Sequence, residues 1–229
     1  MIKKSNTKSQ LGLRTLLMTF FGFIILAVFF FLPAGTFRYR EAWVYLAILF
    51  IPMMGTMIYL LKKNPKLLER RLNLKERRAQ QKGIIKWAIM IYILAFLLPG
   101  FDKRFGWSHL PEWLVILSDV MILVGYSIFF MVMRENSYAS RTVEIQDGQK
   151  VIRSGPYAIV RHPMYVGVLL LYIFSPLALG SWVALIPMLG MIHFIVLRIK
   201  DEEKALVEDL EGYREYSQEV RYRLIPGIW

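Results

Sequence analysis

The stretch "PMYVGVLLLYIFSPLALGSWVALIPMLGMIHFIVL", residues 163–197, contains no Asp, Glu, Lys or Arg and a single histidine, His193. A helix needs roughly 20 apolar residues to cross a hydrocarbon core. The stretch is therefore too long for one span and short for two full ones. Ser175-Pro176 and Gly180-Ser181 mark a break near its middle. We predict a tight hairpin of two short or tilted helices.

Further apolar runs precede this hairpin, and 56% of the chain is hydrophobic, more than a soluble domain usually carries. One run is short for a full crossing, and the segment after it, residues 101–111, is expected to be a turn. The last run contains Asp119, which is either a functional group within a span or a residue near the interface. The sequence predicts an all-α integral membrane protein with about six transmembrane helices, the first four at Thr15–Phe37, Ala42–Leu61, Trp87 to about Gly100 and Trp113–Met133.

The distribution of charge predicts the orientation of these spans. The net charge is +12, and Lys and Arg collect at the N-terminus, in residues 62–86, in residues 134–162 and in the tail after Leu197. Six spans would place all these segments on one side, which the positive-inside rule assigns to the cytoplasm. We therefore expect both termini to be cytoplasmic, with a C-terminal helix in a tail that is mostly helical up to about Val220. Basic residues that meet lipid headgroups explain the charge better than nucleic-acid binding does.

The loop at residues 62–86 has helical spacing, with Leu67, Leu68, Leu72 and Leu74 among basic residues. Such a pattern is typical of an amphipathic helix lying on the membrane surface. A solvated helix that does not contact the membrane would show the same pattern.

Arg161 and His162 precede Pro163, a residue that suits the first turn of a helix because it lacks an N–H group. The unpaired N–H groups of such a helix start favour an anion, for example a carboxylate. Alternatively, Arg, His and Tyr could serve here as anchors at the headgroup level.

A second polar cluster, "RIKDEEKALVEDLEGYREYSQEV", follows the hairpin directly. On a helix, Arg198 and Glu202 would share one face, as an exposed salt bridge or as part of a site. The hairpin returns the chain to the side of His162, so both clusters can meet there. Together they would suit a cationic cofactor and an anionic substrate. The chain has no cysteine and only three histidines, and therefore a metal site is not expected.

Several of these residues resemble the isoprenylcysteine carboxyl methyltransferase family of integral membrane enzymes. The resemblance rests on Gly155-Pro156-Tyr157, Arg161-His162-Pro163, Tyr165 and Gly167, then the hairpin, Glu202-Glu203, and Gly212-Tyr213, Tyr216 and Val220. It covers roughly residues 136–229. It implies a division into an N-terminal four-span region, residues 1–133, and a methyltransferase core, residues 134–229.

The resemblance also implies S-adenosyl-L-methionine as cofactor and a lipid-like or prenylated carboxylate as acceptor, entering from the bilayer. Arg198 would be the catalytic and substrate-binding residue. The residues that would bind the cofactor are Gln149, Lys150, Val151, Ile152, Tyr157, His162, Pro163, Met164, Tyr165 and Glu202. Relatives often have His at the position of Gln149, so contacts there are expected from the backbone.

Other functions remain open at this point. The ending "VRYRLIPGIW" resembles the tail of membrane sterol reductases, which use NADPH. A phospholipid or amine N-methyltransferase is a further enzymatic alternative. A membrane scaffold or transporter is the non-enzymatic alternative.

Overall fold

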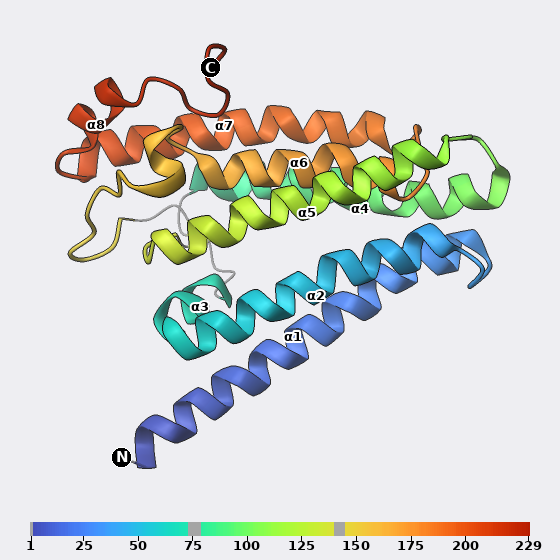
Figure 1. Cartoon of the computed structure of the whole chain (residues 1–229), viewed down its shortest axis with the longest axis horizontal. Helices are drawn as coiled ribbons and strands as arrows, with labels where there is room; N and C mark the ends of the chain where they lie inside the picture. The colour runs from blue at the N-terminus through green and yellow to red at the C-terminus, as the bar shows by residue number, and fades with distance from the viewer. Residues whose placement is uncertain (1, 73–78, 140–144) are drawn as a thin grey trace.

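The computed structural model describes residues 2–72, 79–139 and 145–229, and within these ranges the chain is helical without a β-strand (Figure 1). The long helices alternate in direction, so that one end of the bundle collects the basic segments and the other end collects short turns (Figure 1). The helices are α1 (Ile2–Ala34), α2 (Arg40–Lys63), α3 (Pro65–Leu72), α4 (Ala79–Phe105), α5 (Glu112–Glu135), α6 (Pro163–Ala178), α7 (Leu185–Asp209) and α8 (Tyr213–Glu219), with a 3-10 turn η1 (Gly155–Ala158).

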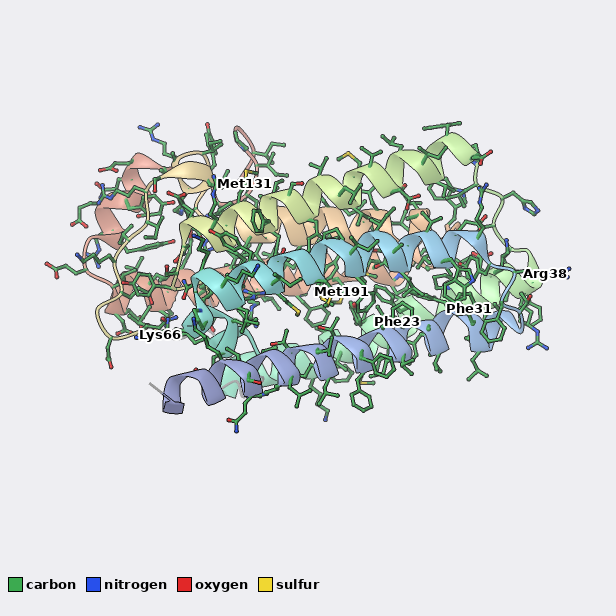
Figure 2. All side chains as sticks on the ribbon, turned by 60° about the horizontal axis from the view of Figure 1, so that its bottom comes forward. Phe23, Phe31, Arg38, Lys66, Met131 and Met191 are labelled. Carbon is green, nitrogen blue, oxygen red and sulfur yellow. The ribbon has the colours of Figure 1, made fainter. Side chains whose placement is uncertain are left out.

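Among the residues that the structure describes, three helices are long and apolar enough to cross a membrane by length and composition: residues 8–34, 40–63 and 112–135. Side chains cover the outside of the bundle, and Arg38 and Lys66 lie near its opposite ends (Figure 2). The predicted hairpin is confirmed, since α6 and α7 are separated by a short turn in which Gly180 adopts a φ of +76°.

The hairpin is held to α5 by a glycine contact. A Cβ atom on Gly167 would lie 2.7 Å from the carbonyl oxygen of Gly125, and one on Gly125 would lie 2.9 Å from that of Gly167. Small residues of this kind allow helix backbones to approach closely, as membrane helix pairs often require. This contact fixes the start of α6 relative to the end of α5, where the polar cavity lies.

The prediction for the third apolar run was wrong. Instead of a short helix ending near Gly100 and a turn from residue 101, α4 continues through Pro99 to Phe105. Gly100 does not end the helix but allows α4 to pack closely against α1. A Cβ atom at this position would lie 2.5 Å from the Phe30 carbonyl oxygen of α1. The turn begins at Gly106, whose φ is +66°.

For the part of residues 62–86 that the structure describes, the expectation that the leucines face the membrane was wrong. Helix α3 is short, and the Asn64 side chain accepts a hydrogen bond from the Leu67 N–H at its start. Leu67, Leu68 and Leu72 are buried inside the protein, next to Val132 and other apolar residues, rather than facing lipid or water. Leu74 lies outside the described residues.

The tail is mostly helical up to Val220, as expected, and it consists of two helices. Helix α7 ends at Asp209, and a turn through Gly212, with a φ of +79°, redirects the chain into α8. This turn places α8 against the end of α7, on the side of the cavity described below.

Candidate functional site

One cavity lies at the basic end of the bundle, bounded by η1, the start of α6, the end of α7 and α8. The segment before η1 closes another side. Every site residue predicted from the sequence lines this cavity: Gln149, Lys150, Val151, Ile152, Tyr157, His162, Pro163, Met164, Tyr165, Arg198 and Glu202. The fold thus brings together the two polar clusters that the sequence separates by the hairpin.

The Tyr165 hydroxyl connects the two sides of the cavity. It accepts a hydrogen bond from Nε of Arg198 at 2.9 Å and donates one to Oε2 of Glu202 at 2.7 Å. Arg198 and Glu202 share one face of α7, as their spacing predicts, but they meet through this phenol. This geometry favours the second reading of the Arg198–Glu202 spacing, in which the two residues form part of a site.

The neighbouring glutamate, Glu203, points away from this relay into a charge cluster. Its Oε1 accepts a hydrogen bond from Nε of Arg161 at 2.6 Å and lies 3.3 Å from Nε2 of His162. Its Oε2 accepts a hydrogen bond from Nε of Arg223 at 2.6 Å. Arg161, His162 and Glu203 are all buried. This burial within the protein excludes the alternative in which Arg161 and His162 are headgroup-level anchors.

Arg161 also holds the C-terminal tail. Its Nη1 donates to the carbonyl oxygens of Val220 and Arg221 at 2.7 and 2.8 Å, and more weakly to that of Ser217. The backbone N–H groups of Arg161 and His162 donate to carbonyl oxygens of the same tail. Arg161 therefore acts mainly as a structural clamp rather than as an open anion site.

The cluster controls the ionisation of Glu203, which lies beyond the apolar part of α7 that ends at Leu197. Burial alone would raise the pKa of this carboxyl. Hydrogen bonds from His162, Arg161 and Arg223 outweigh the burial and lower the pKa from 4.5 to about 2. The carboxylate is therefore charged at neutral pH.

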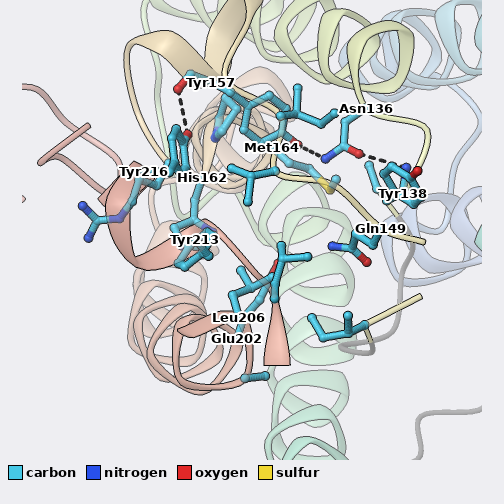
Figure 3. A pocket seen from close by; sticks show the side chains of 18 of the residues that line it. Asn136, Tyr138, Gln149, Tyr157, His162, Met164, Glu202, Leu206, Tyr213 and Tyr216 are labelled. Carbon is cyan, nitrogen blue, oxygen red and sulfur yellow. Dashed lines mark hydrogen bonds between the residues drawn. The ribbon is translucent and has the colours of Figure 1, made fainter. Parts of the chain in front are cut away.

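A hydrogen-bonded frame supports the opposite wall (Figure 3). The Tyr157 hydroxyl accepts a hydrogen bond from the Asn136 side chain at 2.8 Å, and the Tyr216 hydroxyl donates to the Tyr157 carbonyl at 2.7 Å. Burial raises the pKa of Tyr157 above its usual range and that of Tyr216 to about 12. Both phenols are neutral donors or acceptors at physiological pH.

The segment that precedes η1 folds onto itself before reaching the cavity. The Gln149 side-chain oxygen accepts a hydrogen bond from the Gln146 N–H at 3.0 Å. The Tyr138 hydroxyl donates to the Gly148 carbonyl at 3.0 Å. The side-chain oxygen of Gln149 is thus used within the loop, which agrees with the expectation that backbone groups of residues 149–152 face a ligand.

Sequence reasoning missed part of the lining. Tyr213 and Tyr216 appeared only among the residues that carry the family resemblance, and their position after Gly212 gave no indication that α8 turns back to the cavity. The apolar members gave no signal beyond ordinary core residues. The missed lining residues are Asn136, Tyr138, Ala139, Ile145, Ala205, Leu206, Leu210, Tyr213 and Tyr216.

Two further features considered from the sequence were Asp119 and a possible metal site. Asp119 lies in the second turn of α5, half-buried, and does not line the cavity. No group of His, Asp and Glu within the described residues could hold a metal ion.

Comparison with known proteins identifies the region that contains much of this site. Residues 115–208 match the isoprenylcysteine carboxyl methyltransferase family, which confirms the resemblance expected from the sequence. A Delta(14)-sterol reductase of Mus musculus is 29% identical over 92 residues, or 38% of this chain. The match spans 22% of that relative, about a fifth of its length. With the three apolar helices, the family match indicates a multi-pass integral membrane protein.

A solved structure of a eukaryotic intramembrane Ras methyltransferase, isoprenylcysteine carboxyl methyltransferase, is also similar. It has a TM-score of 0.49 and 18% sequence identity, and the alignment covers 93% of this chain and 85% of that chain.

Proposed function

We propose that this chain, whose residues 115–208 match the isoprenylcysteine carboxyl methyltransferase family, is a membrane methyltransferase. It would transfer a methyl group from S-adenosyl-L-methionine to the carboxylate of a lipid-like or isoprenylcysteine-type acceptor. The observation that carries this proposal is the cavity in which Tyr165 joins Arg198 to Glu202. The basic group of Arg198 suits an anionic acceptor, and the acidic group of Glu202 beside it suits a cationic cofactor.

The donor set of the cavity fits this cofactor. Glu202 offers a carboxylate to an ammonium group or to ribose hydroxyls, and the backbone of residues 149–152 offers further polar groups. His162 and the first turn of α6 line the cavity beside them. Apolar side chains, including Val151 and Leu206, complete the wall and would exclude water from the ligand.

In this proposal, the protein contributes positioning rather than acid–base chemistry. A carboxylate is already a nucleophile at neutral pH, and therefore no general base is required. Held by Glu202 and the backbone of residues 149–152, the cofactor would supply an electrophilic methyl group, and its sulfur would keep the electron pair of the C–S bond when the acceptor oxygen takes that methyl. Arg198 would grip the acceptor carboxylate, which a guanidinium matches in a bidentate geometry. Orientation of this kind can supply several kcal/mol of barrier lowering.

The Tyr165 hydroxyl has a positioning role in this scheme. By accepting from Nε of Arg198, it restricts the guanidinium to one plane, and by donating to Glu202, it links the acceptor side to the cofactor side. We expect Tyr165→Phe to reduce methyl transfer more than cofactor binding, because Arg198 loses an acceptor that orients it, whereas Glu202 loses one donor but keeps its charge for the cofactor.

We further propose that α1, α2, α4, α5, α6 and α7 cross the membrane, with both termini and the cavity at the cytoplasmic face. The basic segments at one end of the bundle support this orientation. In this arrangement the acceptor arrives from the bilayer and the cofactor from the cytoplasm. We keep the division into residues 1–133 and 134–229 as part of the proposal, because all residues that line the cavity lie between Asn136 and Tyr216.

The orientation can be tested with single cysteines, because the chain has none of its own. Arg38 and Glu211 are exposed at opposite ends of the bundle. In intact cells, a membrane-impermeant maleimide should label Arg38→Cys and should label Glu211→Cys only after the membrane is opened. Labelling of both variants, or the reverse pattern, would contradict the orientation.

The function is tested by binding and by transfer, on the full chain in nanodiscs. S-adenosylhomocysteine should bind in calorimetry, and radiolabelled methyl should move to a prenylcysteine or lipid acid as a base-labile ester. Glu202→Gln should weaken binding at least several-fold, whereas Glu208→Gln, an exposed acid on the same helix, should not. Arg198→Lys should retain binding and lose transfer, with exposed Arg214→Lys as control. A folded protein that binds no S-adenosylhomocysteine would refute the proposal.

A second candidate is a reductase that uses NADPH, and it is favoured by the match of 92 residues to a Delta(14)-sterol reductase. The carboxylate of Glu202 in the cavity wall argues against it, because a 2′-phosphate prefers Arg and Lys. Titration with NADPH in the same calorimetric experiment separates the two functions. An amine N-methyltransferase would instead give a base-stable methylated product.

A further inference from the structure

A second cleft lies between α1 and α3, apart from the cavity described above. The described residues that line it are Arg14 of α1 and Lys66, Glu69 and Arg70 of α3, and none of them lines the first cavity. Arg14, Lys66 and Glu69 are exposed, and Arg70 is half-buried. Figure 2 shows Lys66 at the end of the bundle where α1 begins. Three cations and one carboxylate give these walls a positive potential, which favours an anion.

The α3 wall of this cleft is held in place from its inner side. Leu67, Leu68 and Leu72 are buried in an apolar cluster. Nη1 of Arg71 donates a hydrogen bond to the Ala139 carbonyl oxygen at 3.0 Å. These inward contacts fix the orientation of the short helix, so the side chains on its outer side are presented to the cleft at fixed positions. A ligand that binds there has little protein to order.

Arg14 joins the two walls. Its Nη2 donates a hydrogen bond to the carbonyl oxygen of Leu72, the last residue of α3, at 3.3 Å. A guanidinium has five N–H groups, so this single contact leaves others to a ligand. Its planar fork matches the oxygens of a phosphate group, and Lys66 adds a mobile point charge beside it.

An apolar strip continues from Arg14 along α1. Arg14 is the last charged residue before the uncharged residues 15–37. Leu17, Phe21 and Ile25 follow it by 3, 7 and 11 positions, which places them on the same face of the helix. They are 47%, 61% and 51% exposed. The cleft therefore lies at the level where the charged end of the bundle meets its apolar surface, as a phospholipid headgroup does.

We infer that the cleft between α1 and α3 binds the phosphate of an anionic phospholipid, whose acyl chains lie along the exposed strip of α1. Basic pockets between membrane helices bind such headgroups on the cytoplasmic side. Arg14, Lys66 and Arg70 would hold the phosphate, and Glu69 would oppose it because it carries the same sign of charge. The inference is independent of the proposed methyl transfer, since these residues do not line the cavity in which that reaction would occur.

The test is the lipid preference of the full chain in detergent, measured by native mass spectrometry with equal amounts of phosphatidylglycerol and phosphatidylcholine. Wild type should retain phosphatidylglycerol preferentially. One basic residue near a membrane surface attracts an anionic lipid by about fivefold in affinity. Lys66→Gln/Arg70→Gln should therefore reduce the preference at least about tenfold. This variant keeps Arg14 and its bond to Leu72, so its thermal midpoint without added lipid should equal that of wild type.

The matched control is Lys62→Gln/Lys63→Gln. These two lysines are exposed at the end of α2, directly before α3, but they do not line the cleft. The control removes the same charge and should reduce the preference far less. An equal reduction in both variants would show that the whole basic surface attracts the lipid, and it would overturn the site. A wild type without preference for phosphatidylglycerol would overturn it as well.

Two further measurements identify the ligand. Glu69→Gln should strengthen phosphatidylglycerol binding by about fivefold, because it removes the opposing charge, whereas Glu208→Gln, an exposed acid on α7, should not. A weaker affinity of Glu69→Gln would contradict the assigned orientation of the headgroup. Phosphatidylglycerol should raise the thermal midpoint of wild type, and inorganic phosphate at millimolar concentration should not. An equal rise with phosphate would assign the cleft to a soluble anion and overturn the lipid.

Discussion

The Glu203 carboxylate should be a larger contributor to stability than any surface ion pair of this chain. Its side chain is 11% exposed, and its partners Arg161 and His162 are 6% and 4% exposed. Replacing it in Glu203→Gln leaves two guanidinium groups, those of Arg161 and Arg223, without their anion. Breaking a buried pair by removing one partner costs about 3–5 kcal/mol. For a chain of this length that corresponds to a fall of roughly 6–20 °C in the thermal midpoint.

The matched control is Glu219→Gln. Arg153 and Glu219 lie 2.6 Å apart, the same distance as Arg161 and Glu203, but their side chains are 45% and 58% exposed. An exposed pair contributes about 0–1 kcal/mol, so the midpoint should fall by at most a few degrees. Thermal unfolding of both variants in the same detergent measures the difference. Equal midpoints would show that burial does not govern the strength of these pairs.

Three further predictions concern stability and packing. The pKa of Glu203 falls from 4.5 to about 2 on folding, so its stabilisation is present above pH 4.5 and should be lost between pH 4.5 and about 2. The thermal midpoint of the wild type should therefore fall over this pH range, and the midpoint of Glu203→Gln should lack this part of the fall. Gly167→Ala should cost about 1–3 kcal/mol, because its Cβ would meet the Gly125 carbonyl at 2.7 Å, whereas Gly190→Ala, with open space around it, should be neutral in the same unfolding assay. Asp102→Ala should lower the free energy of unfolding by about 2 kcal/mol or more in the same assay, because the Asp102 carboxylate accepts hydrogen bonds from Ser108, in the turn after α4, and from Ser181, in the turn before α7. An unchanged midpoint would refute that role.

The sequence was sufficient to predict the hairpin and the meeting of the two polar clusters. An uncharged run of this length with Pro and Gly at its middle has few other solutions in a membrane. Once the hairpin returns the chain to its starting side, His162 and Arg198 must lie near the same face. The motif then identified residues that all line one cavity.

The path of α4 could not be predicted in the same way, because Pro99-Gly100 is a common stop signal. Its continuation depends on α1, whose backbone at Phe30 approaches so closely that only glycine fits. Similarly, the leucines of α3 are amphipathic in the sequence, but whether lipid, water or protein covers them depends on α2 and α5. Contacts between helices that are distant in the sequence determine such features, and the local sequence of α3 or α4 does not indicate those contacts.

The pair Glu202-Glu203 shows how one residue step separates function from structure. Successive residues on an α-helix point about 100° apart, so the two carboxylates can face different partners. A sequence that reads "EE" does not say which one faces the ligand. Here Glu202 turns to Tyr165 and the cavity, while Glu203 turns to Arg161 and the tail.

The same step explains why Arg161, His162 and Tyr165 occur so close together in the chain. Arg161 and His162 stand just before α6 and bind Glu203, whereas Tyr165 stands in its first turn and binds Glu202. Both contacts fasten the start of α6 to the same turn of α7, one for stability and one toward the ligand. A substitution of Glu203 should therefore disturb ligand binding mainly by loosening the protein. Tyr165→Phe removes two hydrogen bonds but no buried charge, so it should lower stability less than Glu203→Gln does and should reduce transfer by more than that loss of stability explains. Measuring stability and transfer together on both kinds of variant separates the two roles that the sequence places side by side.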